Sequence, residues 1–105
     1  MDMKKFQQEV DKWTAQFDPQ YWPPHEVLAR LMEETGELAR EVNHRFGNKK
    51  KKANEEEKQM GDEMADVIFT LACLANSQNI DLSEHMQRVI DKCYKRDNSR
   101  YKKKA

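Results

Sequence analysis

The sequence has little glycine, proline or cysteine, no excess of either charge and no long hydrophobic run. Its 105 residues include three glycines, three prolines and two cysteines, and 19 basic side chains balance 19 acidic ones. A zero net charge argues against binding of a nucleic acid polymer through overall electrostatic attraction. No stretch approaches the roughly 18 apolar residues that a membrane span needs. We therefore expect a cytoplasmic protein whose partners include neither a nucleic acid polymer nor a membrane.

The two cysteines, Cys73 and Cys93, lie within helical patterns, without a CxxC or a Cys/His ligand spacing. We interpret both as reduced core thiols rather than as disulfide, metal or catalytic residues. Strand alternation, internal repeats and a glycine-rich phosphate loop are also lacking. The sequence contains no Ser/His/Asp or Cys/His arrangement that would activate a nucleophile. These absences favour an all-α protein whose chemistry does not pass through a covalent enzyme intermediate.

Apolar residues recur with helical period in four stretches. The stripes are Met3, Phe6, Val10, Trp13 and Phe17, ended by Asp18 and Pro19; Val27, Leu28, Leu31, Met32, Leu38, Val42 and Phe46; residues 67–75; and Leu82, Met86, Val89, Ile90, Cys93 and Tyr94. Pro24 is suited to the first turn of the second helix, which Gly47 ends. A capping box at Asn54 and Glu57 predicts the start of the third helix, and Asp81 predicts the start of the fourth.

Hydrophobic residues make up 37% of the chain and charged residues 36%, against averages of about 45–50% and about 25%. A domain of this size buries only about two-thirds of its unfolded surface. The run 67–75 is apolar on nearly every side and should be buried on every side, which needs covering partners. We therefore expect one helical domain over residues 1–97, followed by a basic, disordered tail over 98–105. We expect a homodimer or homotetramer to complete the core of this domain.

Three acids, Glu33, Glu34 and Glu37, fall within an arc of about 100° beside the second apolar stripe. A solvated acidic face would also explain this triplet, although like charges at these spacings repel. A second pair, Glu63 and Asp66, precedes the apolar run, where an uncompensated carboxylate is costly. Carboxylates from two antiparallel helices can converge on a hard divalent cation, and Mg²⁺ fits best because no thiolate or imidazole is in the set. The two acidic groups together favour a metal site.

Two other interpretations stay open. Glu41 and His44 have the Glu-x-x-His spacing of carboxylate-bridged di-iron bundles, but such bundles need the motif twice. His44, close to Gly47, is suited instead to the negative end of the helix dipole. A non-enzymatic helical interaction module, whose acidic face binds basic partners, is the second alternative. It predicts that Mg²⁺ has no effect on affinity.

Two further features bear on ligands. Basic residues form two runs without acids, residues 49–52 and the four cations within 100–104. Such runs are usually solvated, and the alternative is that the first run lies near a polyanionic ligand. Trp22, beside Pro23 and Pro24, can stack on a nucleobase. Trp13 could stack in the same way. Core packing is the other interpretation of both tryptophans, and it is favoured most for Trp13, which lies on an apolar stripe.

The segments LARLMEETGELA at residues 28–39 and GDEMADV at residues 61–67 resemble the motif helices of the MazG-like nucleoside triphosphate pyrophosphohydrolases. The shared pattern is Glu-Glu-x-x-Glu, followed after 25 intervening residues by Glu-x-x-Asp, and the resemblance extends over about residues 22–96. That family belongs to an all-α superfamily with the dimeric dUTPases and the phosphoribosyl-ATP pyrophosphohydrolases. The resemblance implies a four-helix MazG-like bundle completed by homo-oligomerisation.

The resemblance also implies an activity. It is the Mg²⁺-dependent cleavage, with Mn²⁺ as a substitute, of the α–β phosphate bond of a nucleoside triphosphate, which gives a nucleoside monophosphate and pyrophosphate and would serve nucleotide-pool housecleaning. The implied metal ligands are Glu34, Glu37, Glu63 and Asp66. Glu33 would be a ligand or orient the attacking water, and Lys92 and Arg96 would face the phosphates. Relatives often carry asparagine where this chain has Cys73 and Ile90.

Overall fold

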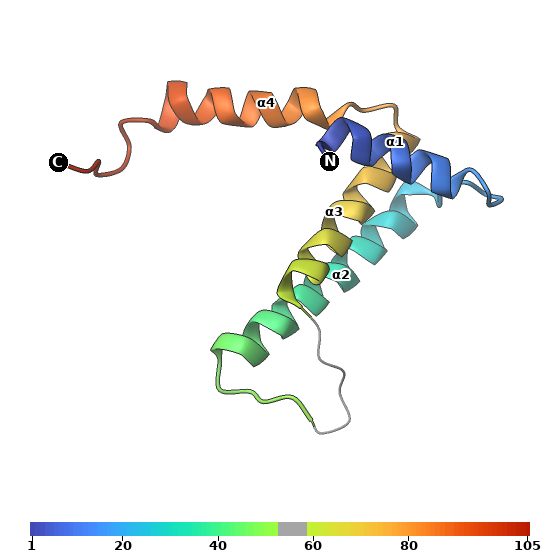
Figure 1. Ribbon diagram of the computed structural model, residues 1–105, viewed down its shortest axis with the longest axis horizontal. Helices are drawn as coiled ribbons and strands as arrows, with labels where there is room; N and C mark the ends of the chain where they lie inside the picture. Colours follow the sequence, from blue (N-terminus) through green and yellow to red (C-terminus); the bar gives the residue numbers. More distant parts are fainter. Residues whose placement is uncertain (53–58) are drawn as a thin grey trace.

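The computed structural model describes residues 1–52 and 59–105, which form four α-helices and a short π-helix (Figure 1). The α-helices are α1 (Met3–Thr14), α2 (Pro24–Phe46), α3 (Met60–Ser77) and α4 (Leu82–Lys92), and the π-helix is Cys93–Asp97. The expected all-α class is therefore confirmed. None of the helices in the two described ranges combines the length and the hydropathy of a transmembrane segment.

Local sequence sets several helix starts. Asp2 caps α1 by accepting a hydrogen bond from the Lys5 amide at 2.8 Å, and Asp81 caps α4 by accepting one from the Ser83 amide at 3.0 Å. Such caps satisfy first-turn amides that have no partner within the helix. α2 begins at Pro24, as the sequence predicts.

The end of α1 differs from the prediction. The helix stops at Thr14 instead of continuing to Asp18. Beyond it the chain turns back, and the Gln20 side-chain amide donates to the Asp11 carbonyl oxygen at 3.1 Å and to the Asp11 carboxylate at 3.0 Å. These contacts hold the linker against the last turn of α1, and a linker in that position is incompatible with a longer helix.

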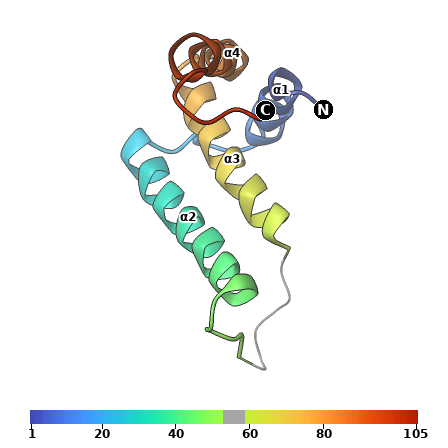
Figure 2. The same cartoon turned by 90° about the vertical axis from the view of Figure 1, so that its left-hand side faces the viewer.

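α2 and α3 form an antiparallel pair that lies side by side in both views (Figures 1 and 2). Among the described residues α3 begins at Met60, whose preceding residue Gln59 has an extended backbone. The predicted capping box of Asn54 and Glu57 lies outside the described residues.

The hydrophobic core is small and lies where α1 crosses one end of the α2–α3 pair (Figure 2). The buried apolar residues of the described chain are Val10, Val27, Ala72 and Ala75. Ile68 and Leu71 remain 40% and 39% exposed, so the expected burial of run 67–75 on every side is not met within one chain. The reason is that α1 covers only part of α3.

α4 extends away from the helical pair (Figure 1) and packs mainly against α1. Its apolar side chains Met86, Val89 and Ile90 are about half exposed. Cys93, expected in a core, is exposed for the same reason, whereas Cys73 is half-buried. The radius of gyration is 17.3 Å, against about 13 Å for a compact chain of this length. One chain is thus an elongated, open arrangement of helices.

Candidate functional site

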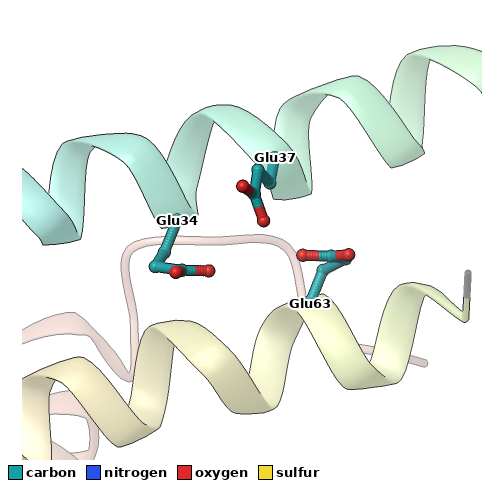
Figure 3. Close-up of side chains that lie close together, drawn as sticks. All are labelled: Glu34, Glu37 and Glu63. Carbon is teal, nitrogen blue, oxygen red and sulfur yellow. The ribbon is translucent and has the colours of Figure 1, made fainter.

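Three carboxylates converge between α2 and α3 (Figure 3). Glu34 and Glu37 come from adjacent turns of α2, and Glu63 comes from the first turn of α3. One oxygen of each carboxylate lies within 4.8 Å of the others. Glu34 and Glu63 are buried, whereas Glu37 is exposed. Carboxylate oxygens this close together can share one hard divalent cation.

Glu34 has only part of its charge compensated. Its Oε1 accepts from Arg30 Nε at 2.8 Å, while its buried Oε2 has no hydrogen-bond donor among the described residues. Burial raises the pKa of Glu34 above its ordinary value of 4.5, the Arg30 charge opposes that shift, and the nearby charges of Glu37, Asp66 and Glu63 add to it. A buried carboxylate with an unused oxygen is a site where a cation would be stabilised.

Asp66, the fourth predicted ligand, lies one turn after Glu63 on α3 and outside the tight group of three. It is exposed and lines a cavity together with Glu34 and Glu37. The structure therefore brings the four predicted ligands to one place, with three of them in mutual contact range and Asp66 at the margin of the cavity.

The cavity has a volume of about 650 Å³ and adjoins the carboxylates. Its lining includes five aromatic residues, Trp13, Phe17, Tyr21, Trp22 and Phe69. The ring of Trp13 packs edge-on against Phe17 and Phe69, with centroid separations of 5.0 and 6.1 Å. Half-exposed aromatic rings beside an open volume offer stacking surfaces for a flat ligand. The cavity therefore joins an aromatic end to an acidic end.

A network of polar side chains supports the aromatic end of the cavity through Tyr21. The Tyr21 hydroxyl donates to Asp11 Oδ1 at 2.6 Å and accepts from Asn76 Nδ2 at 3.0 Å. Asn76 also exchanges hydrogen bonds with Gln7, and the Gln7 side chain accepts from the Leu82 amide at 2.9 Å. This network connects the wall of the cavity with α1, the end of α3 and the start of α4. Its buried members are satisfied, which favours one fixed arrangement.

The remaining predicted residues occupy different places. Glu33 is exposed, lies 3.9 Å from Arg30 and is not in the cavity lining. Trp22 lines the cavity. Lys92 ends α4 and Arg96 lies in the π-helix, and both are exposed and outside the cavity lining. Within one chain, the fold does not bring Lys92 and Arg96 to the carboxylates, and their roles stay predictions.

The sequence indicates no site role for Arg30, and for Trp13 it favours core packing over stacking on a nucleobase. The core assignment of Trp13 is wrong, because this residue is 55% exposed and lines the cavity. Its stripe extends past the point where α1 crosses α3, so its far end faces open volume. The signal for Arg30 was available in the sequence, since it precedes Glu34 by one helical turn.

Glu41 belongs to a separate contact. It is buried on α2, one turn beyond Glu37, and Lys51 Nζ lies 3.3 Å from its Oε2. His44 lies in the last turn of α2, as expected. The Lys51 ammonium already compensates the charge of Glu41, and this contact disfavours the di-iron interpretation.

Known proteins resemble the chain over nearly its whole length. It is 52% identical over 102 residues, 97% of this chain and 92% of the relative, to YpjD of Bacillus subtilis (strain 168), a protein of uncharacterised function. It is 32% identical over 98 residues, 84% of this chain and 92% of the relative, to YvdC of the same organism, also uncharacterised.

Two crystal structures are also similar. One is B. subtilis YpjD, described as a candidate pyrophosphatase, with a TM-score of 0.78, 53% identity, and coverage of 88% of this chain and 94% of that one. The other is a Bacillus-conserved MazG protein, a nucleotide pyrophosphohydrolase, with a TM-score of 0.74, 42% identity and coverage of 88% of each chain. The family profile of the MazG nucleotide pyrophosphohydrolase domain matches residues 23–101, and the chain belongs to this family.

Proposed function

We propose that this chain is a cytoplasmic, Mg²⁺-dependent nucleoside triphosphate pyrophosphohydrolase that cleaves the bond between the α and β phosphates. The observation that carries the proposal is the junction of an acidic cluster with an aromatic cavity in one site. A nucleoside triphosphate has the matching construction, a flat base joined to a polyanion. Family membership supports the same class of reaction.

The residues present fit a divalent cation. Glu34, Glu37 and Glu63 supply oxygen ligands from two helices, and Asp66 adds a fourth carboxylate nearby. The buried, unused Oε2 of Glu34 supports the assignment, because such an oxygen is costly without a positive partner. Oxygen-only ligand sets suit Mg²⁺, and Mn²⁺ is the natural substitute. When bound, Mg²⁺ would polarise the phosphoryl oxygens and lower the pKa of a coordinated water.

The reaction needs one water and no covalent enzyme intermediate. The water oxygen bonds to a phosphorus beside the α–β bridging oxygen, and the opposite bond from that phosphorus to the bridging oxygen breaks. The leaving group, which is pyrophosphate if the α phosphorus is attacked and the nucleoside monophosphate if the β phosphorus is attacked, takes the electron pair. The proton of the water passes to a carboxylate of the cluster. Nucleoside monophosphate and pyrophosphate result, and atoms and charge balance.

The protein's own residues would bind and orient the reactants. Trp22, with Trp13, offers a stacking face for the base at the aromatic end. Arg30, which lines the cavity beside Glu34, holds that carboxylate in place. Glu33 would orient the attacking water, and Lys92 and Arg96 would stabilise charge that develops on the phosphates.

A homo-oligomer is part of the proposal. The small core and the exposed apolar residues of α3 and α4 support a second copy of the chain as the missing cover. Because α4 extends away from the pair α2–α3 (Figure 1), Lys92 at its end and Arg96 in the π-helix that follows would act at the site of a neighbouring chain.

The test is direct. The purified protein is incubated with a set of canonical and modified nucleoside triphosphates, with and without Mg²⁺, and the products are identified. Monophosphate and pyrophosphate that form only with Mg²⁺ would support the proposal. Release of inorganic phosphate would refute the assignment of the bond. A helical interaction module, the competing interpretation, predicts no turnover and no Mg²⁺ effect.

A further inference from the structure

The proposed function leaves the basic run 49–52 unexplained. Three of its lysines are exposed, but the Lys51 side chain is only 16% exposed and contacts the buried Glu41 at 3.3 Å. A solvated loop would leave all four side chains in water. The contact places Lys51, and with it the backbone of the run, against α2 at Glu41, although ordering one long side chain costs conformational entropy.

That place continues the row of site carboxylates. Glu34, Glu37 and Glu41 follow one another on a single face of α2 at spacings of three and four residues. At 1.5 Å of rise per residue, Glu41 lies about 6 Å beyond Glu37 along the helix axis. The aromatic cavity lies in the opposite direction, near the start of α2. Aromatic wall, carboxylate cluster and lysine run therefore follow one another along α2.

The charges along this row change sign at Glu41. Without Lys51, a further buried carboxylate would extend the negative potential past the cluster. With Lys51 beside it, the pair is neutral. Lys49, Lys50 and Lys52, which flank Lys51 in the sequence and are exposed, add three positive charges to this part of the chain. A polyanion that extends from the cavity past the carboxylates would meet cations at this end.

We propose that residues 49–52 form the subsite for the terminal phosphates of the substrate, which leave as pyrophosphate, and that the Lys51–Glu41 ion pair anchors this subsite. The inference rests on the proposed function and specifies how the substrate is oriented along α2. The base lies at the aromatic end, the α–β bond lies at the carboxylates, and the β and γ phosphates point toward the C-terminal end of α2. Lys49, Lys50 and Lys52 contact the phosphates, and Lys51 is a positioning residue.

The experiment measures binding of pyrophosphate in the presence of Mg²⁺, and of a nucleoside monophosphate, by isothermal titration calorimetry. The test variant carries Lys49→Gln, Lys50→Gln and Lys52→Gln. The matched control carries Lys102→Gln, Lys103→Gln and Lys104→Gln, which removes the same charge from the C-terminal run. Thermal melting of both variants verifies that the fold is intact.

We expect the loop variant to bind pyrophosphate about tenfold more weakly, because three exposed charge contacts of modest strength are lost. Its affinity for the monophosphate should be unchanged, and the control should match the wild type for both ligands. Equal losses in both triple variants, or no loss in the loop variant, would overturn the inference.

The anchor is tested with Glu41→Gln combined with Lys51→Gln, which leaves no buried charge unpaired. This double variant keeps the three exposed lysines and should still lose about tenfold in pyrophosphate affinity, since the run is no longer held beside the cluster. Wild-type affinity in the double variant would show that the ion pair does not position the subsite.

The same proteins and ligands distinguish a failure of this inference from a failure of the proposed function. If the wild type forms no monophosphate and pyrophosphate, the proposed function fails. If it forms both while the loop variant binds pyrophosphate normally, only the subsite is wrong. Loss of binding to a short RNA oligomer in the loop variant, without loss of pyrophosphate binding, would assign the run to nucleic acid instead.

Discussion

Burial and charge oppose each other at Glu34, the residue whose Oε2 is buried without a donor among the described residues. Because burial raises its pKa, the ionised form destabilises the metal-free protein. We predict that Glu34→Gln raises the free energy of unfolding of the metal-free protein at neutral pH, because it removes a carboxylate whose ionised form burial disfavours. Thermal melts in the presence of a chelator measure this change.

Mg²⁺ should raise the melting temperature of the wild type but not of Glu34→Gln, Glu37→Gln or Asp66→Asn.

Glu41→Gln is the matched control for the stability change of Glu34→Gln. Glu41 is also a buried glutamate of α2, but Lys51 pairs with it. Removing its charge should therefore destabilise the protein. If both substitutions change stability in the same direction, the unused oxygen of Glu34 is not what distinguishes the two positions.

Tyr21 gives a pH-dependent prediction. Burial, followed by the hydrogen bond to Asp11, raises the pKa of its hydroxyl above the ordinary value of 10.0. The folded state therefore holds this proton more tightly than the unfolded state, and the Tyr21 contribution to stability, complete below pH 10, is lost as pH rises through the raised pKa. Absorbance titration of tyrosinate should show one of the three tyrosines ionising late. Tyr21→Phe should remove that late step, and Asp11→Asn should shift it to lower pH.

At the scale of single residues, the sequence predicts the positions of the acidic site residues better than those of the aromatic ones. Glu34, Glu37 and Glu63 can be placed together because helical spacing fixes which face each one occupies. Trp13 could not be placed, because a periodic apolar stripe indicates a buried face but not how far the covering helix extends. Asn76 could not be found either, since its partners Gln7 and Tyr21 are remote in sequence.

Among the helices, α2 contains one interior glycine. Gly36 lies in mid-helix, and a Cβ there would meet no atom within 4 Å. We predict that Gly36→Ala stabilises the protein by roughly 0.5–1 kcal/mol, because alanine restricts the unfolded chain and favours helix. Denaturant unfolding, compared at equal slope, measures the gain. A loss of stability would mean that another surface packs closely at this position.

Gly47 is the contrasting position at the end of the same helix. A Cβ there would lie 2.5 Å from Asn43 Oδ1 and 2.7 Å from the Asn43 carbonyl oxygen. The carbonyl belongs to the helix and cannot move away cheaply. Gly47→Ala should therefore destabilise the protein, whereas Gly36→Ala stabilises it.

The helix ends show what local sequence can and cannot predict. The starts of α2 and α4 follow from Pro24 and Asp81, whose effects are local. The end of α1 at Thr14 depends instead on Gln20, which returns to contact Asp11. A contact between a linker and the helix before it is invisible to a periodicity of apolar residues.

The whole chain exposes more surface than its mass predicts. Its accessible surface is 8729 Å², whereas a compact chain of 12.5 kDa exposes about 6,200 Å². The excess is larger than the roughly 800 Å² that each partner buries in a standard interface. We predict that light scattering at micromolar concentration returns at least twice the chain mass. A value near 12.5 kDa would contradict this.

The interface predicted on α3 can be probed separately. Ile68→Glu places a charge on its exposed apolar surface and should shift the protein toward monomer. Gln8→Glu, at an exposed position on α1, adds the same charge and should leave the mass unchanged. Equal masses for both variants would place the interface elsewhere.

If one site contains residues of two chains, a mixture of two inactive variants should be active. Arg96→Ala should lower turnover by about 10²–10³ if the guanidinium stabilises the reacting phosphates, and Glu37→Gln should remove the metal site. If Arg96 serves the neighbouring chain, then mixing the two inactive variants should recover activity, because each mixed oligomer contains a site with both wild-type residues. No recovery, with subunit exchange verified, would place Arg96 outside a shared site.

Both tryptophans of the chain, Trp13 and Trp22, line the same cavity, and each is about half exposed. All of the protein's indole fluorescence therefore originates at the aromatic end of the site. A base that stacks there should quench this emission, and pyrophosphate, which has no ring, should leave it nearly unchanged. The unlabelled protein thus carries an optical reporter that distinguishes the two ends of its own ligand.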